Sequence, residues 1–149
     1  MVGCPPGALG SLAKRRVAVI TAGSVGGRIA LLLSRMGVGG LLLVDPKRFK
    51  AAGLATHDMG PEDIGKFKAL ETARRCRRIN PAAEVLAFAQ AVEALELAVL
   101  AGVDLVVMAP DLLAAEVEVG QRCIWLGKPL VHASVHGPTL TAQVRFFSN

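Results

Sequence analysis

The sequence has 149 residues, of which 52% are hydrophobic and 19% are charged, so it fits one folded domain and excludes an intrinsically disordered chain. A net charge of +5 favours anionic partners, but with no Tyr, one Trp and five Phe the chain has too few aromatic side chains to indicate nucleic-acid binding by base stacking. No transmembrane run or secretory leader is recognisable and the three cysteines form no disulfide or zinc framework, so we expect a cytoplasmic protein without membrane contact.

Residues 1–15 contain CPPG and KRR and are predicted to form an irregular N-terminal arm. From residue 16 onward, short apolar runs rich in β-formers alternate with helical stretches, a pattern typical of a parallel sheet covered by helices. The predicted strands are 16–20, 41–44, 84–88, 104–108, 130–135 and 140–147. The predicted helices are 25–36, 62–80, 93–101 and 111–126, and the passage 45–61 is predicted to be irregular.

These elements predict an α/β fold: a Rossmann-like, doubly wound, mostly parallel sheet with helices on both faces, formed by one domain over residues 16–149. The chain stops at Asn149 directly after a predicted apolar strand. We therefore expect that it is a fragment of a longer chain.

The segment TAGSVG, residues 21–26, connects the first predicted strand to the first predicted helix. Glycines in such a turn let the backbone approach a phosphate, while N–H groups at the start of the helix point at it. Gly23 and Gly26 match the dinucleotide fingerprint, but Thr21 stands at its first glycine and fits poorly if the turn requires a positive φ. Asp45 lies 19 residues after Gly26, where a carboxylate can accept hydrogen bonds from a ribose. The alternative is a crossover whose glycines only allow close packing.

Three further residues are candidates for contact with an anion or a metal. Lys66 and Lys68 follow the irregular passage, and either could neutralise phosphate charge at the carboxyl edge of the sheet; the alternative is that both only belong to the solvated face of a helix. Asp111 follows a predicted strand and precedes a predicted helix, so it could hold magnesium or serve as an N-cap.

The remaining histidines and cysteines carry no predicted chemistry. His132 and His136 are four residues apart in a predicted strand, roughly 13 Å, too far for both to bind one zinc ion. Cys76 and Cys123 lie within predicted helices, and we expect buried structural thiols, with no thioester-forming cysteine.

Taken in order, six segments resemble the ThiF, MoeB and HesA group of adenylating enzymes, relatives of the ubiquitin-activating enzymes, over residues 15–147. They are RVAVITAGSVGG, MGVGGLLLVD, DIGKFKA, INPAAEV, DLVVMAPD and RCIWLGKPLVHASVHG. The resemblance implies a ThiF-type nucleotide-binding domain that binds ATP with Mg²⁺ and works as a homodimer or heterodimer. It also implies an adenylyltransferase, which activates the C-terminal carboxylate of a ubiquitin-like or sulfur-carrier protein as an acyl-adenylate and releases pyrophosphate.

By position, the resemblance implies a ribose-binding role for Asp45, a phosphate-contacting catalytic role for Lys68 and a magnesium-binding catalytic role for Asp111. The glycine-loop positions that it implies for the nucleotide are Gly23, Ser24 and Gly26. A lysine and a metal ion make sense together there, because attack of a carboxylate on the α-phosphate brings two anions together.

The sequence departs from the family pattern at several of these positions. Lys47 stands where the family has a second aspartate, and residues 53–57 (GLATH) replace an NLNRQ-like stretch, so the arginine that clamps the triphosphate of the neighbouring subunit is missing. Thr21 and Ser24 replace glycines. Two alternatives therefore stay open: a noncatalytic scaffold or interaction subunit of the same fold, and an NAD-dependent oxidoreductase, since Asp45 suits NAD.

Overall fold

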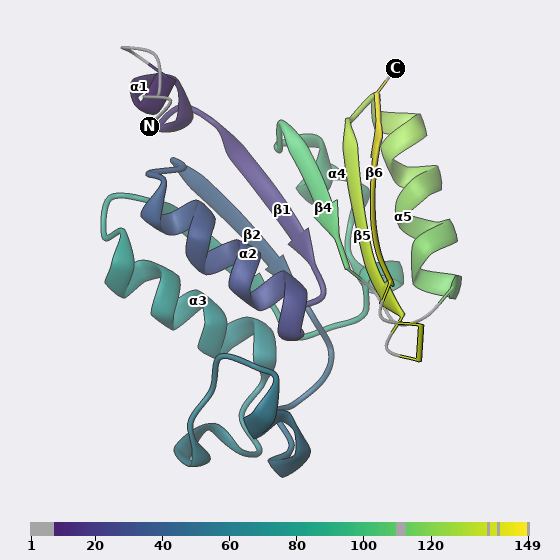
Figure 1. Ribbon diagram of the computed structural model, residues 1–149. Helices are drawn as coiled ribbons and strands as arrows, with labels where there is room; N and C mark the ends of the chain where they lie inside the picture. The colour runs from purple at the N-terminus through teal and green to yellow at the C-terminus, as the bar shows by residue number, and fades with distance from the viewer. Residues whose placement is uncertain (1–7, 110–112, 137, 140, 149) are drawn as a thin grey trace.

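The computed structural model describes residues 8–109, 113–136, 138–139 and 141–148. The described strands form one six-stranded sheet in the order β3-β2-β1-β4-β5-β6 (Figure 1). Strands β1 to β5 are parallel, and β6 pairs with β5 in antiparallel fashion. The strands are β1 (Arg16–Ile20), β2 (Gly40–Val44), β3 (Glu84–Phe88), β4 (Leu105–Met108), β5 (Leu130–His136) and β6 (Thr141–Phe147). The predicted fold class is thereby confirmed.

Helices cover both faces of this sheet. The helices α2 (Ser24–Arg35) and α3 (Lys68–Ile79) lie side by side over β1 and β2 in Figure 1. On the other face lie α4 (Leu97–Ala101) and α5 (Leu113–Leu126), with α5 beside β5 and β6. None of the helices in the described ranges is both long and apolar enough to cross a membrane.

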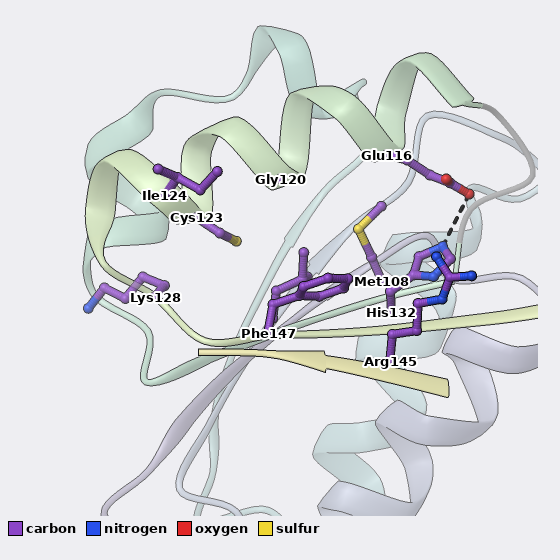
Figure 2. Close-up of a pocket in the computed structure, with 10 residues that line it drawn as sticks. Met108, Glu116, Gly120, Cys123, Ile124, Lys128, His132, Arg145 and Phe147 are labelled. Carbon is purple, nitrogen blue, oxygen red and sulfur yellow. Dashed lines mark hydrogen bonds and ion pairs between the residues drawn. The ribbon is translucent and has the colours of Figure 1, made fainter. Parts of the chain in front are cut away.

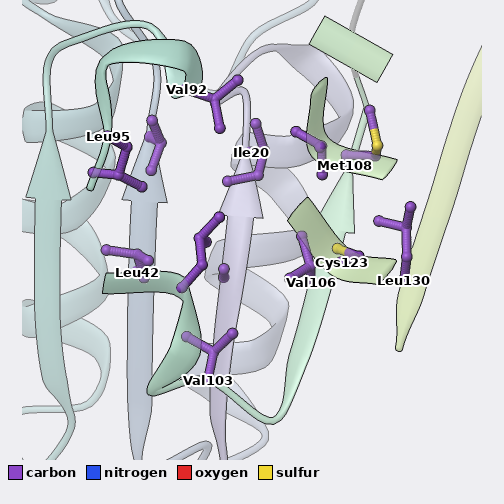
Figure 3. Packing of buried hydrophobic residues seen from close by; sticks show 13 residues of the cluster. Ile20, Leu42, Val92, Leu95, Val103, Val106, Met108, Cys123 and Leu130 are labelled. Atoms are coloured by element: carbon purple, nitrogen blue, oxygen red, sulfur yellow. The ribbon is translucent and has the colours of Figure 1, made fainter. Parts of the chain in front are cut away.

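Side-chain alternation in β1 divides the core in two. Val17 and Val19 pack into the cluster under α2 and α3, whereas Ala18 and Ile20 pack into the cluster under α4 and α5 (Figure 3). Because helices cover both faces, the central strands read as continuous apolar runs instead of alternating ones. One cysteine lies in each cluster, and burial raises the pKa of both thiols, which confirms the expectation of buried thiols at Cys76 and Cys123.

The second predicted helix, over 62–80, begins later than expected, and the later start places the candidate residue Lys68 at its first position. Residues 62–67 are not α-helical: Pro61–Asp63 form a 3₁₀ turn and Gly65 takes a φ of +86°, a left-handed conformation that interrupts a helix. Lys68 is therefore the first residue of α3, and its backbone N–H donates to Lys47 O at 3.0 Å. A sequence signal for this break was present in Gly65, but the periodicity of the helix that follows masked it.

Two other predicted elements differ from the structure. The helix predicted over 93–101 is divided into a 3₁₀ turn, Val92–Ala94, and α4, because the buried guanidinium of Arg122 donates to the carbonyls of Leu95 and Glu93. The predicted irregular arm contains a short helix, α1 (Ala8–Leu12). The backbone after α1 hydrogen-bonds to the start of β2, so the described part of the arm is attached to the sheet.

A buried carboxylate fixes the loop between β2 and α3. Asp63 is 0% exposed, and its Oδ2 accepts from Gly60 N–H at 2.8 Å and from the Arg75 guanidinium. Lys66 Nζ lies 3.3 Å from Asp63 Oδ1, and Arg75 also donates to the carbonyl oxygen of Asp58. Lys66 therefore takes part in holding the loop, and its possible role as a phosphate ligand stays a prediction.

We expect the stability of the protein to fall in acid because of Asp63. Burial raises the pKa of this carboxyl, but the Gly60 hydrogen bond, Lys66 and the charge of Arg75 outweigh it and hold the pKa below its ordinary value. A depressed pKa stabilises the fold above the unfolded pKa, about 3.9, and this contribution is lost as the pH falls through the folded pKa. Asp63→Asn should lower the free energy of unfolding by about 2 kcal/mol at pH 7 and much less at pH 3. Urea denaturation at both pH values checks this, and an equal loss at both would contradict it.

Candidate functional site

The candidate site lies at the carboxyl ends of β1, β2 and β4. The strand order turns in opposite directions from β1, towards β2 on one side and β4 on the other, and ligands of open α/β sheets bind at such a switch point. At this edge Thr21 N–H donates to Val44 O at 2.8 Å, and Asp45 N–H donates to Phe88 O at 3.1 Å. The first loop, residues 21–23, and the residue after β2 are thereby fixed to the ends of neighbouring strands.

The loop after β1 has the backbone geometry of the dinucleotide fingerprint, even at Thr21, which stands where the fingerprint has its first glycine. Thr21 takes a φ of +73°, the left-handed conformation that a β-branched residue rarely adopts. Its Oγ1 donates to Ala109 O at 2.9 Å, which ties the strained residue to the end of β4. A Cβ on Gly23 would meet nothing closer than His57 Nε2 at 4.0 Å, so the backbone there is open to a ligand, whereas a Cβ on Gly26 would lie 1.9 Å from Thr21 O. Thr21 thus makes the tight turn, Gly23 lets a ligand approach the backbone, and Gly26 allows close packing against the loop.

Thr21 affects stability in two opposite ways, because its hydroxyl donates a hydrogen bond to Ala109 while its left-handed backbone is strained. Thr21→Val keeps the backbone strain and removes the hydrogen bond to Ala109, so we expect a loss of about 1 to 2 kcal/mol in the free energy of unfolding. Thr21→Gly loses the same bond but relieves strain of about 1 to 3 kcal/mol, and should be the more stable of the two variants. Urea denaturation of both variants decides the order, and a less stable glycine variant would show that the left-handed backbone stores no strain.

Asp45 is buried at this edge and accepts two backbone hydrogen bonds. Its Oδ2 accepts from Ala22 N–H and its Oδ1 from Lys47 N–H, each at 2.7 Å, and the residue is 3% exposed. The carboxylate therefore braces the glycine loop against the end of β2. A carboxylate has about four lone-pair sites, so two hydrogen bonds leave acceptor capacity for hydroxyl groups of a ligand.

Asp45 and Lys68 line one cavity of about 200 Å³. Lys68 reaches it from the first turn of α3, and Thr21 and Lys47 line it from the loops after β1 and β2. Ala91, Val92, Glu93 and Ala115 add the wall on the side of α5. This volume is below the roughly 300–1,000 Å³ of typical small-molecule pockets, so it fits part of a nucleotide.

A histidine that the sequence did not point to lies against this lysine. His57 Nε2 is 3.1 Å from Lys68 Nζ, and His57 Nδ1 is 3.0 Å from Thr56 Oγ1. Burial and the positive charge of Lys68 hold the pKa of His57 below its ordinary value. A histidine in an irregular loop shows no periodicity, and the signal that it faces Lys68 exists only in three dimensions.

The other predicted site residues have different positions. Ser24 is the first residue of α2, and Gly26 faces the packed side of that helix's first turn. Lys47, at the position of the family's second aspartate, lines the cavity together with Lys68. Asp111 lies outside the residues that the structure describes, so its predicted magnesium-binding role stays a prediction.

A second cavity, of about 300 Å³, lies between α5 and the strands β5 and β6 (Figure 2). Its wall is largely apolar, with Met108, Leu130 and Phe147 among the lining residues, and His132 Nε2 lies 3.1 Å from Glu116 Oε1. Of the predicted site residues that the structure describes, none lines it. The two cavities therefore offer different chemistry, and of the candidate residues Asp45 and Lys68 line the first.

Comparisons with known proteins agree on one family. The family model described as "ThiF family" matches residues 4–147. The chain is 34% identical over 125 residues to the adenylyltransferase and sulfurtransferase MOCS3 of Mus musculus, covering 83% of this chain and 27% of that protein. It is 33% identical over 125 residues to the sulfur carrier protein ThiS adenylyltransferase of Escherichia coli, covering 82% of this chain and 49% of the relative.

A solved structure supports the same fold. The crystal structure of E. coli MccB with succinimide superposes with a TM-score of 0.77 at 20% identity, covering 85% of this chain and 39% of that one. This chain thus spans less than half the length of each of these three proteins.

Proposed function

The chain belongs to the ThiF family, and on that basis we propose that it binds ATP and activates the C-terminal carboxylate of a ubiquitin-like or sulfur-carrier protein as an acyl-adenylate. The single observation that carries the proposal is that Asp45 and Lys68 line one cavity beside the glycine loop. Family membership gives no support to the oxidoreductase alternative.

In this proposal each described residue has a role set by its position. Asp45 accepts hydrogen bonds from the ribose hydroxyls with the lone pairs that Ala22 and Lys47 leave unused. The open backbone at Gly23 and the first turn of α2 face the phosphates.

Lys68 supplies the positive charge for the chemical step. A carrier carboxylate attacks the α-phosphate, a P–O bond forms and the bond to the pyrophosphate leaving group breaks, so negative charge builds on oxygens close to the lysine. The ammonium group is held ready from the start of α3 and needs no rearrangement of the backbone. Magnesium would neutralise part of the triphosphate charge, and the proposed ligand for it is Asp111, since Mg²⁺ binds through one or two carboxylates plus phosphate oxygens.

ATP–pyrophosphate exchange tests the proposal. The protein is incubated with ATP, Mg²⁺, labelled pyrophosphate and a ubiquitin-like sulfur carrier, and we expect label to enter ATP only when the carrier is present. The matched control is the same carrier with its C-terminal carboxylate amidated, which cannot attack phosphorus. Exchange that does not depend on the free carboxylate, or no exchange together with no ATP binding, would contradict the proposal.

A second candidate, a noncatalytic interaction subunit, is favoured by two observations. Lys47 brings a second positive charge to the cavity where the family has an aspartate, and residues 53–57 contain no arginine. Such a subunit would bind the carrier or ATP without exchange. A dimer whose second subunit supplies the arginine would reconcile both candidates, and light scattering of the protein with and without its carrier measures that assembly.

A further inference from the structure

We propose that His57 positions Lys68 in the free protein and binds the distal phosphates of ATP together with Lys68, taking up a proton from solvent as the nucleotide binds. The inference rests on the proposed ATP site. It adds to that site His57, a residue of the stretch 53–57 to which the sequence analysis assigned no role of its own.

The contacts of the ring determine its protonation in the free protein. An ammonium group has three N–H donors and no acceptor, so Nε2 of His57 must accept from Lys68 at 3.1 Å. The ring is then neutral and carries its proton on Nδ1, which donates to Thr56 Oγ1 at 3.0 Å. The backbone N–H of His57 donates to Gly53 O at 2.8 Å, and the ring of Phe49 stands edge-on to the imidazole with centroids 5.9 Å apart. Three groups thus contact the imidazole, the backbone of His57 is fixed to Gly53, and the ring in turn holds Lys68.

The position of the ring points to a phosphate. Gly23, whose Cβ direction leads to His57 Nε2 at 4.0 Å, immediately precedes α2. Lys68 lines the Asp45 cavity, while His57 lines a separate hollow together with Arg28 and Arg35 of α2 and with Asp58. The contact between His57 and Lys68 thus joins the proposed ribose end of the site to a hollow with two arginines, where the charged end of a nucleotide would extend.

The charges around His57 explain why its proton is linked to binding. Lys68 of α3 and Arg28 of α2 lower its pKa, as does burial, while Asp45 after β2 and the backbone contact with Gly53 raise it. Asp58, the next residue, lies 3.7 Å from the Arg75 guanidinium, which balances its charge. A polyphosphate brings several negative charges to this group of cations and favours the protonated ring.

The protonated ring needs an acceptor for its Nε2–H, and the ammonium group of Lys68 is not one. Once protonated, Nε2 carries an N–H and no longer accepts from the ammonium group, so two donors face each other. A phosphate oxygen placed between them accepts from both. Nucleotide binding and protonation of His57 therefore favour each other.

Calorimetry in buffers of different ionisation enthalpy measures this proton directly. ATP with saturating Mg²⁺ is titrated into the protein at pH 7.5 in PIPES and in Tris, and the difference in binding enthalpy gives the protons taken up. We expect at least about half a proton per ATP, and a similar value with inorganic tripolyphosphate. His57→Gln, whose amide oxygen still accepts from Lys68 but cannot be protonated, should show no uptake and bind ATP about 5- to 20-fold more weakly.

His132→Gln is the matched control, because His132 lies in the other cavity against Glu116. It should retain both the uptake and the affinity. Saturable ATP binding without buffer dependence, or uptake that persists in His57→Gln, would overturn this inference and leave the proposed function standing. No binding of ATP or tripolyphosphate to the folded wild-type protein would overturn both.

Discussion

Gly26→Ala should lower the free energy of unfolding by at least about 3 kcal/mol, enough to leave a marginally stable domain mostly unfolded. The added Cβ would lie 1.9 Å from Thr21 O and 3.4 Å from Val19 Cγ1. Neither neighbour can move easily, since Thr21 is held in a left-handed conformation by bonds to Val44 and Ala109, and Val19 is buried in the centre of the sheet. Circular dichroism and urea denaturation measure the loss.

The next residue provides the control for this substitution. A Cβ on Gly27 would lie 3.4 Å from Ala22 O, an ordinary contact, and the position is inside α2. Gly27→Ala should therefore be neutral or stabilising by about 0.5 to 1 kcal/mol, the usual gain for alanine over glycine in a helix. Equal stability of the two variants would show that the loop can shift to admit a side chain at Gly26.

Lys68→Ala is expected to reduce ATP–pyrophosphate exchange by about 100- to 1,000-fold, the range for loss of one preorganised charged or hydrogen-bonding group at a reacting centre. The affinity for ATP should fall by about 10- to 100-fold, because a charge-assisted contact is worth roughly 1.5 to 3 kcal/mol. Lys68 lies on the first turn of α3, and within the described ranges its side chain forms no ion pair with an acidic residue, so little loss of stability is expected. Exchange and binding of a fluorescent ATP analogue measure the two effects.

Lys66→Ala separates a site effect from a general loss of positive charge. Lys66 contacts Asp63 and does not line the Asp45 cavity. It should leave ATP affinity within about twofold of the wild type, since Asp63 keeps its hydrogen bonds to Gly60 and Arg75 when Lys66 is removed. If both lysine variants lost exchange equally, the assignment of Lys68 to the nucleotide would be wrong.

The fold was predictable because the strands carry its pattern in their own residues. Residues 16–20 and 84–88 were predicted with the bounds that the structure has, and the antiparallel β6 was anticipated as a strand of a mostly parallel sheet. The start of α3 was not predicted with its observed bound, because the helical periodicity of the following residues masked the break at the left-handed Gly65. The division at Leu95 depends on Arg122, 27 residues further along the chain, and local sequence carries no sign of it.

The site was predictable to the extent that its residues follow strands. Asp45 directly follows β2, and the spacing of Gly23 and Gly26 from β1 set the loop, including the positive φ that Thr21 adopts in place of glycine. His57 was missed because its contact with Lys68 is made by the return of a loop held through Asp63 and Arg75. The cavity that joins Asp45 to Lys68 is likewise a product of tertiary structure.

The central claim is that ATP binds in the cavity shared by Asp45 and Lys68. Titration of isotopically labelled protein with ATP and Mg²⁺, followed by amide NMR, locates the ligand in one experiment. We predict saturable shifts centred on residues 21–27, Asp45, His57 and Lys68. Shifts centred instead on the cavity lined by Lys128 and Arg145, or none in a folded protein at millimolar ATP, would contradict it.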